Sequence, residues 1–136
     1  MKPSPWTAVS LVCLAGLVGC RPAPVEPGPH TFPPRDPTLP AYLAEHRQAI
    51  QLFDDGRYPA CVEALQAWLK QHDAAHPALG GSARYFTGLA YKHMGERNKA
   101  RAAFRELCVH YADVPDTHPG VKWRRWAKQE LRELGP

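Results

Sequence analysis

The sequence predicts an all-α domain in residues 41–136, built from about five helices as two helical hairpins and a C-terminal capping helix. Apolar residues in this range recur at intervals of three and four, the spacing of one face of an α-helix. No segment alternates between apolar and polar residues with the period of two that is typical of a strand. Residues of similar size recur 39 positions apart, so the range also contains an internal repeat.

The repeat matches small residues with small residues and large apolar residues with large apolar ones. Ala49, Gly88 and Ala127 follow one another at intervals of 39 positions. Gly56 and Gly95 have the same separation, and each lies where a helix is expected to end in a left-handed residue. The remaining matches are Cys61 with Ala100, Leu65 with Phe104, and Trp68 with Leu107. Each unit therefore predicts one pair of helices.

Every predicted helix has its own apolar stripe. The first helices of the two units carry Leu43, Ile50, Leu52 and Phe53, and then Tyr85, Phe86, Leu89 and Tyr91. The second helices carry Cys61, Ala64, Leu65, Trp68, Leu69 and His72, and then Ala100, Ala103, Phe104, Leu107, Cys108 and Tyr111. The fifth helix, from about Pro119, carries Trp123, Trp126, Ala127, Leu131 and Leu134. Two longer loops are expected at Ala74–Ser82 and Asp113–Pro119, and Ser82 is expected to be a helix N-cap.

The repeat resembles a known family. Its residue types and spacing resemble the tetratricopeptide signature at Ala49, Leu52, Leu65 and Trp68 in unit one, and at Gly88, Tyr91, Ala100, Phe104 and Leu107 in unit two. The resemblance covers nearly all of residues 41–136. Polar residues depart from it where large apolar ones are usual: Glu45 and Gln48 in unit one, Arg84 and Thr87 in unit two. Cys61 replaces the usual alanine, and the 39-residue period exceeds the common one of about 34.

The tetratricopeptide resemblance implies a groove lined by the first helix of each pair, where another protein or peptide binds. It would be contacted by His46, Arg47, Ile50, Phe53 and Asp54 from unit one, and by Tyr85, Phe86, Leu89, Lys92 and His93 from unit two. The two adjacent aromatic residues are the most suggestive, because aromatic side chains dominate binding hot spots. Packing of these two rings against unit one is the alternative.

The first twenty residues have the order of an export signal. Lys2 precedes an apolar stretch that is too short to cross a bilayer core of about 30 Å. The residues Leu17-Val18-Gly19-Cys20 resemble the lipobox of bacterial lipoproteins. That resemblance implies a diacylglycerol on the sulfur of Cys20, then cleavage after Gly19 that removes residues 1–19, and then an acyl chain on the new amine, with no other cofactor. An ordinary signal peptide, in which Cys20 is incidental, is the alternative.

Residues 20–40 are expected to be the lipidated cysteine followed by a proline-rich tether. Eight prolines lie between Arg21 and Pro40, and proline is excluded from helix and sheet interiors. At about 3.1 Å per residue, twenty residues can extend roughly 60 Å. Because Arg21 rather than aspartate follows Cys20, the lipoprotein resemblance implies the outer membrane, with the domain facing the periplasm. In a cell with one membrane it implies the outer face of that membrane.

The charge pattern argues against nucleic acid as a partner. The formal net charge is +4, which is not the dense basic stripe of a nucleic-acid-binding protein. One local cluster lies in the fifth helix: Lys122, Arg124, Arg125, Lys128 and Arg132. A solvated helix face is expected there, and binding to anionic lipid headgroups is the functional alternative.

No catalytic or metal-binding constellation is evident. Ser82, the only serine after Cys20, lacks the pattern of a nucleophile elbow. His72 and His76 are four residues apart, but the metalloprotease motif is absent and Pro77 indicates that the helix has ended. Asp54-Asp55-Gly56 is not followed by the further oxygen ligands that calcium needs.

Cys61 and Cys108 are expected to be free thiols. One lies near the start of its helix and the other late in its helix, which would hold them too far apart for a disulfide. With no small-molecule substrate or metal indicated, the expected function is a non-enzymatic, lipid-anchored adaptor for an envelope protein or peptide, possible roles being outer-membrane assembly or secretion. A structural subunit without a peptide groove is the second hypothesis, and a small metal-dependent hydrolase is a remote third.

Overall fold

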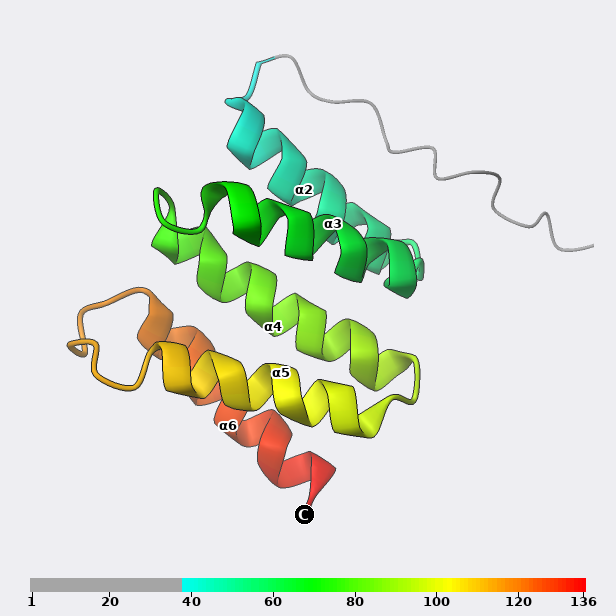
Figure 1. Cartoon of the computed structure of the whole chain (residues 1–136), viewed down its shortest axis with the longest axis vertical. Coiled ribbons are helices and arrows are strands. Elements are labelled where there is room, and N and C mark those ends of the chain that lie inside the picture. The colour runs from blue at the N-terminus through cyan, green and yellow to red at the C-terminus, as the bar shows by residue number, and fades with distance from the viewer. Residues whose placement is uncertain (1–37) are drawn as a thin grey trace, which may run out of the picture. The chain divides into compact units, whose positions relative to one another are not determined.

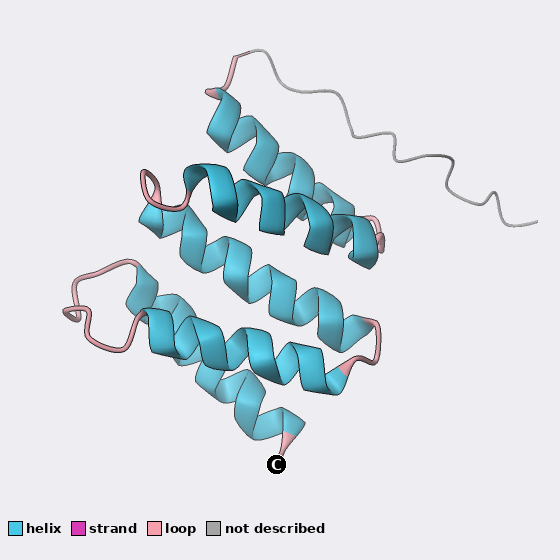
Figure 2. Cartoon of the chain, in the orientation of Figure 1, coloured by secondary structure: helices cyan, strands magenta, loops and turns pink. Residues whose placement is uncertain are grey.

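The computed structural model describes residues 38–136, which form five α-helices joined by short turns and loops (Figures 1 and 2). The helices are α2 (Ala41–Asp54), α3 (Tyr58–His72), α4 (Pro77–His93), α5 (Arg97–His110) and α6 (Gly120–Leu134). These residues include no strand, so the predicted all-α class is confirmed for the part of the chain that is described. The expectations for the signal, for Cys20 and for most of the tether lie outside it.

The helices pack as antiparallel neighbours in chain order, and α4 is the central one (Figure 1). Each helix contacts the next along the chain, and α4 also contacts α2 and α6. The helices α2, α4 and α6 therefore form one layer, while α3 and α5 form the other. Within residues 38–136, no helix is long and apolar enough to cross a membrane.

The two tight turns have the same geometry, as the repeat predicts. Gly56 and Gly95 have φ of +75° and +76°, in the left-handed region where glycine has no steric penalty. The amide of Arg57, after the first glycine, donates to the carbonyl of Leu52 at 2.8 Å. The amide of Glu96 donates to the carbonyl of Tyr91 at 3.0 Å in the second turn. The predicted helix ends are confirmed, and the bonds satisfy carbonyls that the helix leaves unpaired.

The first long loop is shorter than expected, because α4 begins at Pro77. Ser82 lies buried inside α4, so its expected role as an N-cap is wrong. The glycines before it allow close packing rather than a turn. A Cβ on Gly81 would lie 2.4 Å from Trp123 Cδ1, and one on Gly80 would lie 2.0 Å from Asp73 Oδ1. The second loop does separate α5 from α6, and Pro119 is the N-cap of α6.

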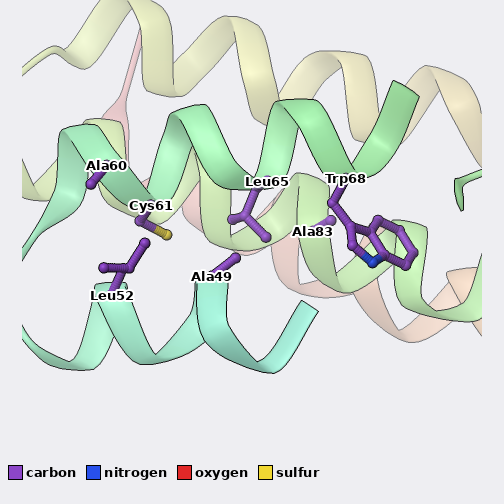
Figure 3. Packing of buried hydrophobic residues seen from close by; sticks show 7 residues of the cluster. All are labelled: Ala49, Leu52, Ala60, Cys61, Leu65, Trp68 and Ala83. Carbon is purple, nitrogen blue, oxygen red and sulfur yellow. The ribbon is translucent and has the colours of Figure 1, made fainter. Parts of the chain in front are cut away.

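The repeated positions form the core in two clusters. The first is Ala49, Leu52, Ala60, Cys61, Leu65, Trp68 and Ala83, and Figure 3 shows its α2 side chains directed toward α3. The second is Ala100, Phe104, Leu107, Tyr111, Ala127 and Leu134. Cys61 belongs to the first cluster and Cys108 packs against the second, and both thiols are free as predicted. Burial raises the pKa of Cys61 to about 12.

Internal partners account for three of the polar residues that depart from the tetratricopeptide pattern. Arg84 donates two hydrogen bonds to the carboxylate of Asp73, from Nη1 at 2.8 Å and from Nη2 at 2.7 Å. The hydroxyl of Thr87 donates to the carbonyl of Ala83 at 2.8 Å. Glu45 pairs with His72 at 2.9 Å. These contacts join neighbouring helices or satisfy a buried hydroxyl, so polar residues are tolerated at these positions.

Candidate partner-binding face

The layer formed by α2, α4 and α6 carries a continuous row of aromatic rings. Ring centroids are 5.2 Å apart between Phe53 and Phe86, 6.0 Å between Phe86 and Tyr85, and 5.7 Å between Tyr85 and Trp126. We call these four side chains the aromatic row. It joins all three helices of the layer, and three of its members were predicted contact residues. The fourth, Trp126, was not.

The junction of α2 with α4 holds the first part of the row. His93 lies 5.4 Å from Phe53, and Tyr58 stacks on His93 at 4.9 Å with planes 12° apart. His93 was a predicted groove residue, whereas Tyr58 was not. Tyr58 is the first residue of α3, directly after the Gly56 turn, so the turn brings its ring back to the first helices. Phe86 therefore does pack against unit one, as the alternative supposed.

The junction of α4 with α6 holds the second part of the row. The Tyr85 ring contacts Trp123 and Trp126 at 5.6 and 5.7 Å, and its hydroxyl donates to Glu130 at 3.3 Å. Lys92 Nζ lies 2.6 Å from Glu130 Oε2. Burial, followed by the charge of Glu130, raises the pKa of Tyr85 to about 12, so the hydroxyl keeps its proton at neutral pH. Tyr85 and Lys92 thus face α6 rather than unit one.

Trp126 is the member of the row that is most open to solvent. Its side chain is 41% exposed, and Lys122 Nζ lies 5.1 Å from its ring centroid. It lines a shallow surface depression together with Tyr85, Gln129 and Glu130. Both tryptophans of α6 lie on the apolar stripe that the sequence predicts for this helix, but only Trp123 is half-buried. Ala127 lies 39 residues after Gly88, and this spacing could have identified α6 as the first helix of a third unit. Trp126 would then have been predicted to lie on the face.

His46 does not lie on an accessible surface, although it was predicted to contact the partner. Its side chain is 6% exposed, and its ring lies 5.2 Å from that of Trp68. Its Nε2 has no hydrogen-bond partner among the described residues. Burial lowers the pKa of His46, opposed by a hydrogen bond with the backbone of Leu79. His46 is therefore not part of the candidate face.

The other predicted residues lie on α2 and α4 around the row. Arg47 and Asp54 are exposed, and they lie on the same side of α2 as Ile50 because they are three and four residues from it. Ile50 is half-buried against the first core cluster, and Leu89 is half-buried against the second. The face therefore has an apolar centre with charges at its border, which is the usual composition of a protein-binding site.

The candidate metal-binding residues have other contacts. His72 pairs with Glu45, and the ring of His76 stacks on that of Tyr42 with centroids 3.6 Å apart. The two histidine rings are 6.5 Å apart. Residues 38–136 contain no group of three or more His, Cys, Asp or Glu side chains that could hold a metal ion. The interactions described for the aromatic row are ring contacts and a hydrogen bond.

No known protein family, curated protein or solved structure matches this chain.

Proposed function

We propose that this protein is a lipid-anchored, non-enzymatic envelope adaptor of the tetratricopeptide type, which binds another protein or a peptide on the face formed by α2, α4 and α6. The lipid on Cys20 would hold it at a membrane, and the proline-rich segment would separate the helices from the anchor. A partner in outer-membrane assembly or secretion fits this arrangement.

The observation that supports binding is the aromatic row with its exposed end at Trp126. Rigid aromatic side chains gain large contact area at a small cost in conformational entropy, which is why they are common in binding hot spots. The row is bordered by Lys92, Glu130 and Glu133, and a partner backbone can form hydrogen bonds with these groups. Lys92 contacts both carboxylates, so the polar border is already ordered before a partner arrives.

Site-specific photo-crosslinking in cells tests the adaptor proposal. A benzophenone amino acid at Trp126 is expected to give a discrete protein adduct, whereas the same residue at Val109 gives none. Val109 is a suitable control because it is 76% exposed and lies on α5, in the other layer. Phe86→Ala should lower the adduct yield from position 126 about tenfold, since it removes the middle of the row.

Each outcome of that experiment distinguishes the hypotheses. Equal adducts at positions 126 and 109 would favour a structural subunit that uses its outer faces. Absence of any adduct at 126, with the folded protein present at normal levels, would contradict the adaptor. A yield that is unchanged by Phe86→Ala would exclude the aromatic row as the binding surface.

Lipid attachment is tested separately with Cys20→Ser. The variant is expected to lose at least about 90% of its membrane-bound fraction. Two or three acyl chains hold a protein stably at a membrane, and the Cys20→Ser protein would carry none. Fractionation with metabolic labelling by palmitate measures both attachment and acylation. Arg21→Ser, which leaves the cysteine in place, should still be labelled. A Cys20→Ser protein that is processed and sediments with membranes as wild type does would refute the anchor.

A further inference from the structure

The charges of the helical domain are separated along the stack of helices. The helices α5 and α6 together contain nine Lys and Arg residues and three Glu residues, a net charge of +6. The helices α2 and α3 contain two Lys and Arg and three Asp and Glu, a net charge of −1. The formal charge of +4 for the whole chain conceals this difference. One end of the stack is therefore strongly basic.

Several of these cations have structural partners. Arg97 donates to the carbonyl of Leu134, Arg101 donates to that of Pro136 at 2.7 Å, and Arg124 donates to those of Tyr111 and Ala112. Lys99 pairs with Glu96 at 2.7 Å, and Lys122 lies over the rings of Trp123 and Trp126. The arginines thus satisfy carbonyls at the C-terminal ends of α5 and α6. This leaves four cations to consider.

Arg105, Arg125, Lys128 and Arg132 form no ion pair among the described residues, and all four are exposed; Arg132 Nε donates only to the carbonyl of Lys128 on its own helix, at 3.3 Å. We call them the basic end face. The three on α6 are spaced by three and four residues, so they share one side of that helix. Arg105 lies on α5 one turn from Arg101, which donates to the carbonyl of Pro136, two residues after α6.

Two observations place the side of α5 that carries Cys108, three residues after Arg105, beside the part of α6 that carries Lys128. The Sγ of Cys108 on α5 lies 3.9 Å from the carbonyl oxygen of Arg124 on α6. Lys128 is close enough to Cys108 to oppose the rise in its pKa that burial causes. The acidic residues of α6 lie on its opposite edge, where Glu130 and Glu133 pair with Lys92. Carboxylates on α6 therefore do not neutralise the basic end face.

We propose that the basic end face docks on an anionic lipid surface. Each Lys or Arg near such a surface contributes to binding without needing a shaped pocket, because lipid charges are distributed over a plane. Val109, 76% exposed, follows Arg105 by one turn of α5 and adds an apolar contact next to the cations. An acidic protein would match the charge as well, but it would have to present carboxylates in one fixed arrangement.

The biological setting of this docking depends on the proposed lipid anchor. A tether that can extend roughly 60 Å would raise the concentration of the domain near the headgroups. Three helices of one layer, at about 8–10 Å spacing, span less than that reach, so a tether that joins the domain at α2 does not prevent α5 and α6 from meeting the membrane. Docking would then orient the aromatic row relative to the membrane.

Vesicle binding tests the proposal without the anchor. The protein is residues 20–136 with Cys20→Ser, and the vesicles contain 30% phosphatidylglycerol in phosphatidylcholine or phosphatidylcholine alone. Partitioning is expected only with the anionic vesicles, and 0.5 M NaCl should abolish it because salt screens exposed charges. Lys128→Glu should weaken partitioning about fivefold, and Lys128→Glu with Arg132→Glu more than tenfold.

The matched control is Lys70→Glu, which makes the same charge change on an exposed residue of α3. It should alter partitioning by less than about twofold. An equal loss with Lys70→Glu and Lys128→Glu would overturn the proposal, as would absence of binding to anionic vesicles at low salt. Binding to poly-glutamate that is as strong as binding to vesicles would indicate that the partner is an acidic protein and not a membrane. If circular dichroism shows that the double variant is unfolded, the vesicle partitioning of Lys128→Gln and the salt titration still test the proposal. Because no lipid is attached and no partner is added, failure here is distinct from failure of the proposed function.

Discussion

Phe104→Ala is expected to lower the free energy of unfolding by about 3–5 kcal/mol, the range for deleting a buried aromatic ring. Phe104 is fully buried in the second core cluster. Its ring packs where Gly88 has no side chain, since a Cβ there would lie 2.5 Å from Phe104 Cε1. The glycine cannot fill the vacated space, so little relaxation is available. Urea denaturation monitored by circular dichroism measures the change.

Two further variants make the Phe104 prediction specific. Val109→Ala, on the same helix but exposed, should change stability by less than about 0.5 kcal/mol. Gly88→Ala should destabilise the wild type but cost less in the Phe104→Ala background, where the clashing ring is gone. A loss below about 1 kcal/mol for Phe104→Ala would show that the contact of α4 with α5 is not as close as described.

Asp73→Ala is expected to lower the free energy of unfolding by about 2 kcal/mol, because it leaves the Arg84 guanidinium without its charged partner. The pair is bidentate, and the side chains are 12% and 20% exposed for Arg84 and Asp73. Solvent reaches it in part, so the loss is smaller than for a fully buried pair. Arg84→Met with Asp73→Ala should be more stable than Asp73→Ala alone, since no unpaired charge is left behind.

The same ion pair predicts a dependence on pH. The hydrogen bonds from Arg84 hold the pKa of Asp73 below its ordinary value of 3.8. The unfolded chain therefore binds a proton more readily than the folded chain, and stability falls as pH drops below about 3.8 and through the folded pKa. Asp73→Asn should reduce this acid loss while lowering stability at pH 7. Equal slopes for the two proteins between pH 2 and pH 5 would contradict the assignment. Denaturation at a series of pH values provides the test.

The repeat allowed most of the fold to be predicted from the sequence. The spacing of 39 residues identified Gly56 and Gly95 as helix ends, and the structure places both in the left-handed region. It also identified the core positions Leu65 and Phe104, which are fully buried. Such features depend on local backbone geometry and on helical periodicity, which adjacent residues determine.

The start of α4 and the position of His46 could not be predicted in the same way. Gly80-Gly81-Ser82 has the composition of a turn, yet it is helical because α4 is packed by all four other helices and needs small residues where Trp123 approaches. His46 has helical spacing with Ile50 and Phe53, but the approach of Trp68 buries it. These outcomes depend on which helices meet, and that information is absent from local patterns.

By itself, the sequence determined that residues 41–136 are helical, where two turns fall, and which apolar stripes form the core, because turn chemistry and helix periodicity act over a few residues. Only the tertiary structure decided that Tyr85 faces α6, that Trp126 completes the aromatic row, and that Cys108 of α5 lies beside Arg124 of α6. Those contacts join residues up to 45 positions apart, as Tyr85 with Glu130 shows. Helix packing, rather than residue type, sets such distances.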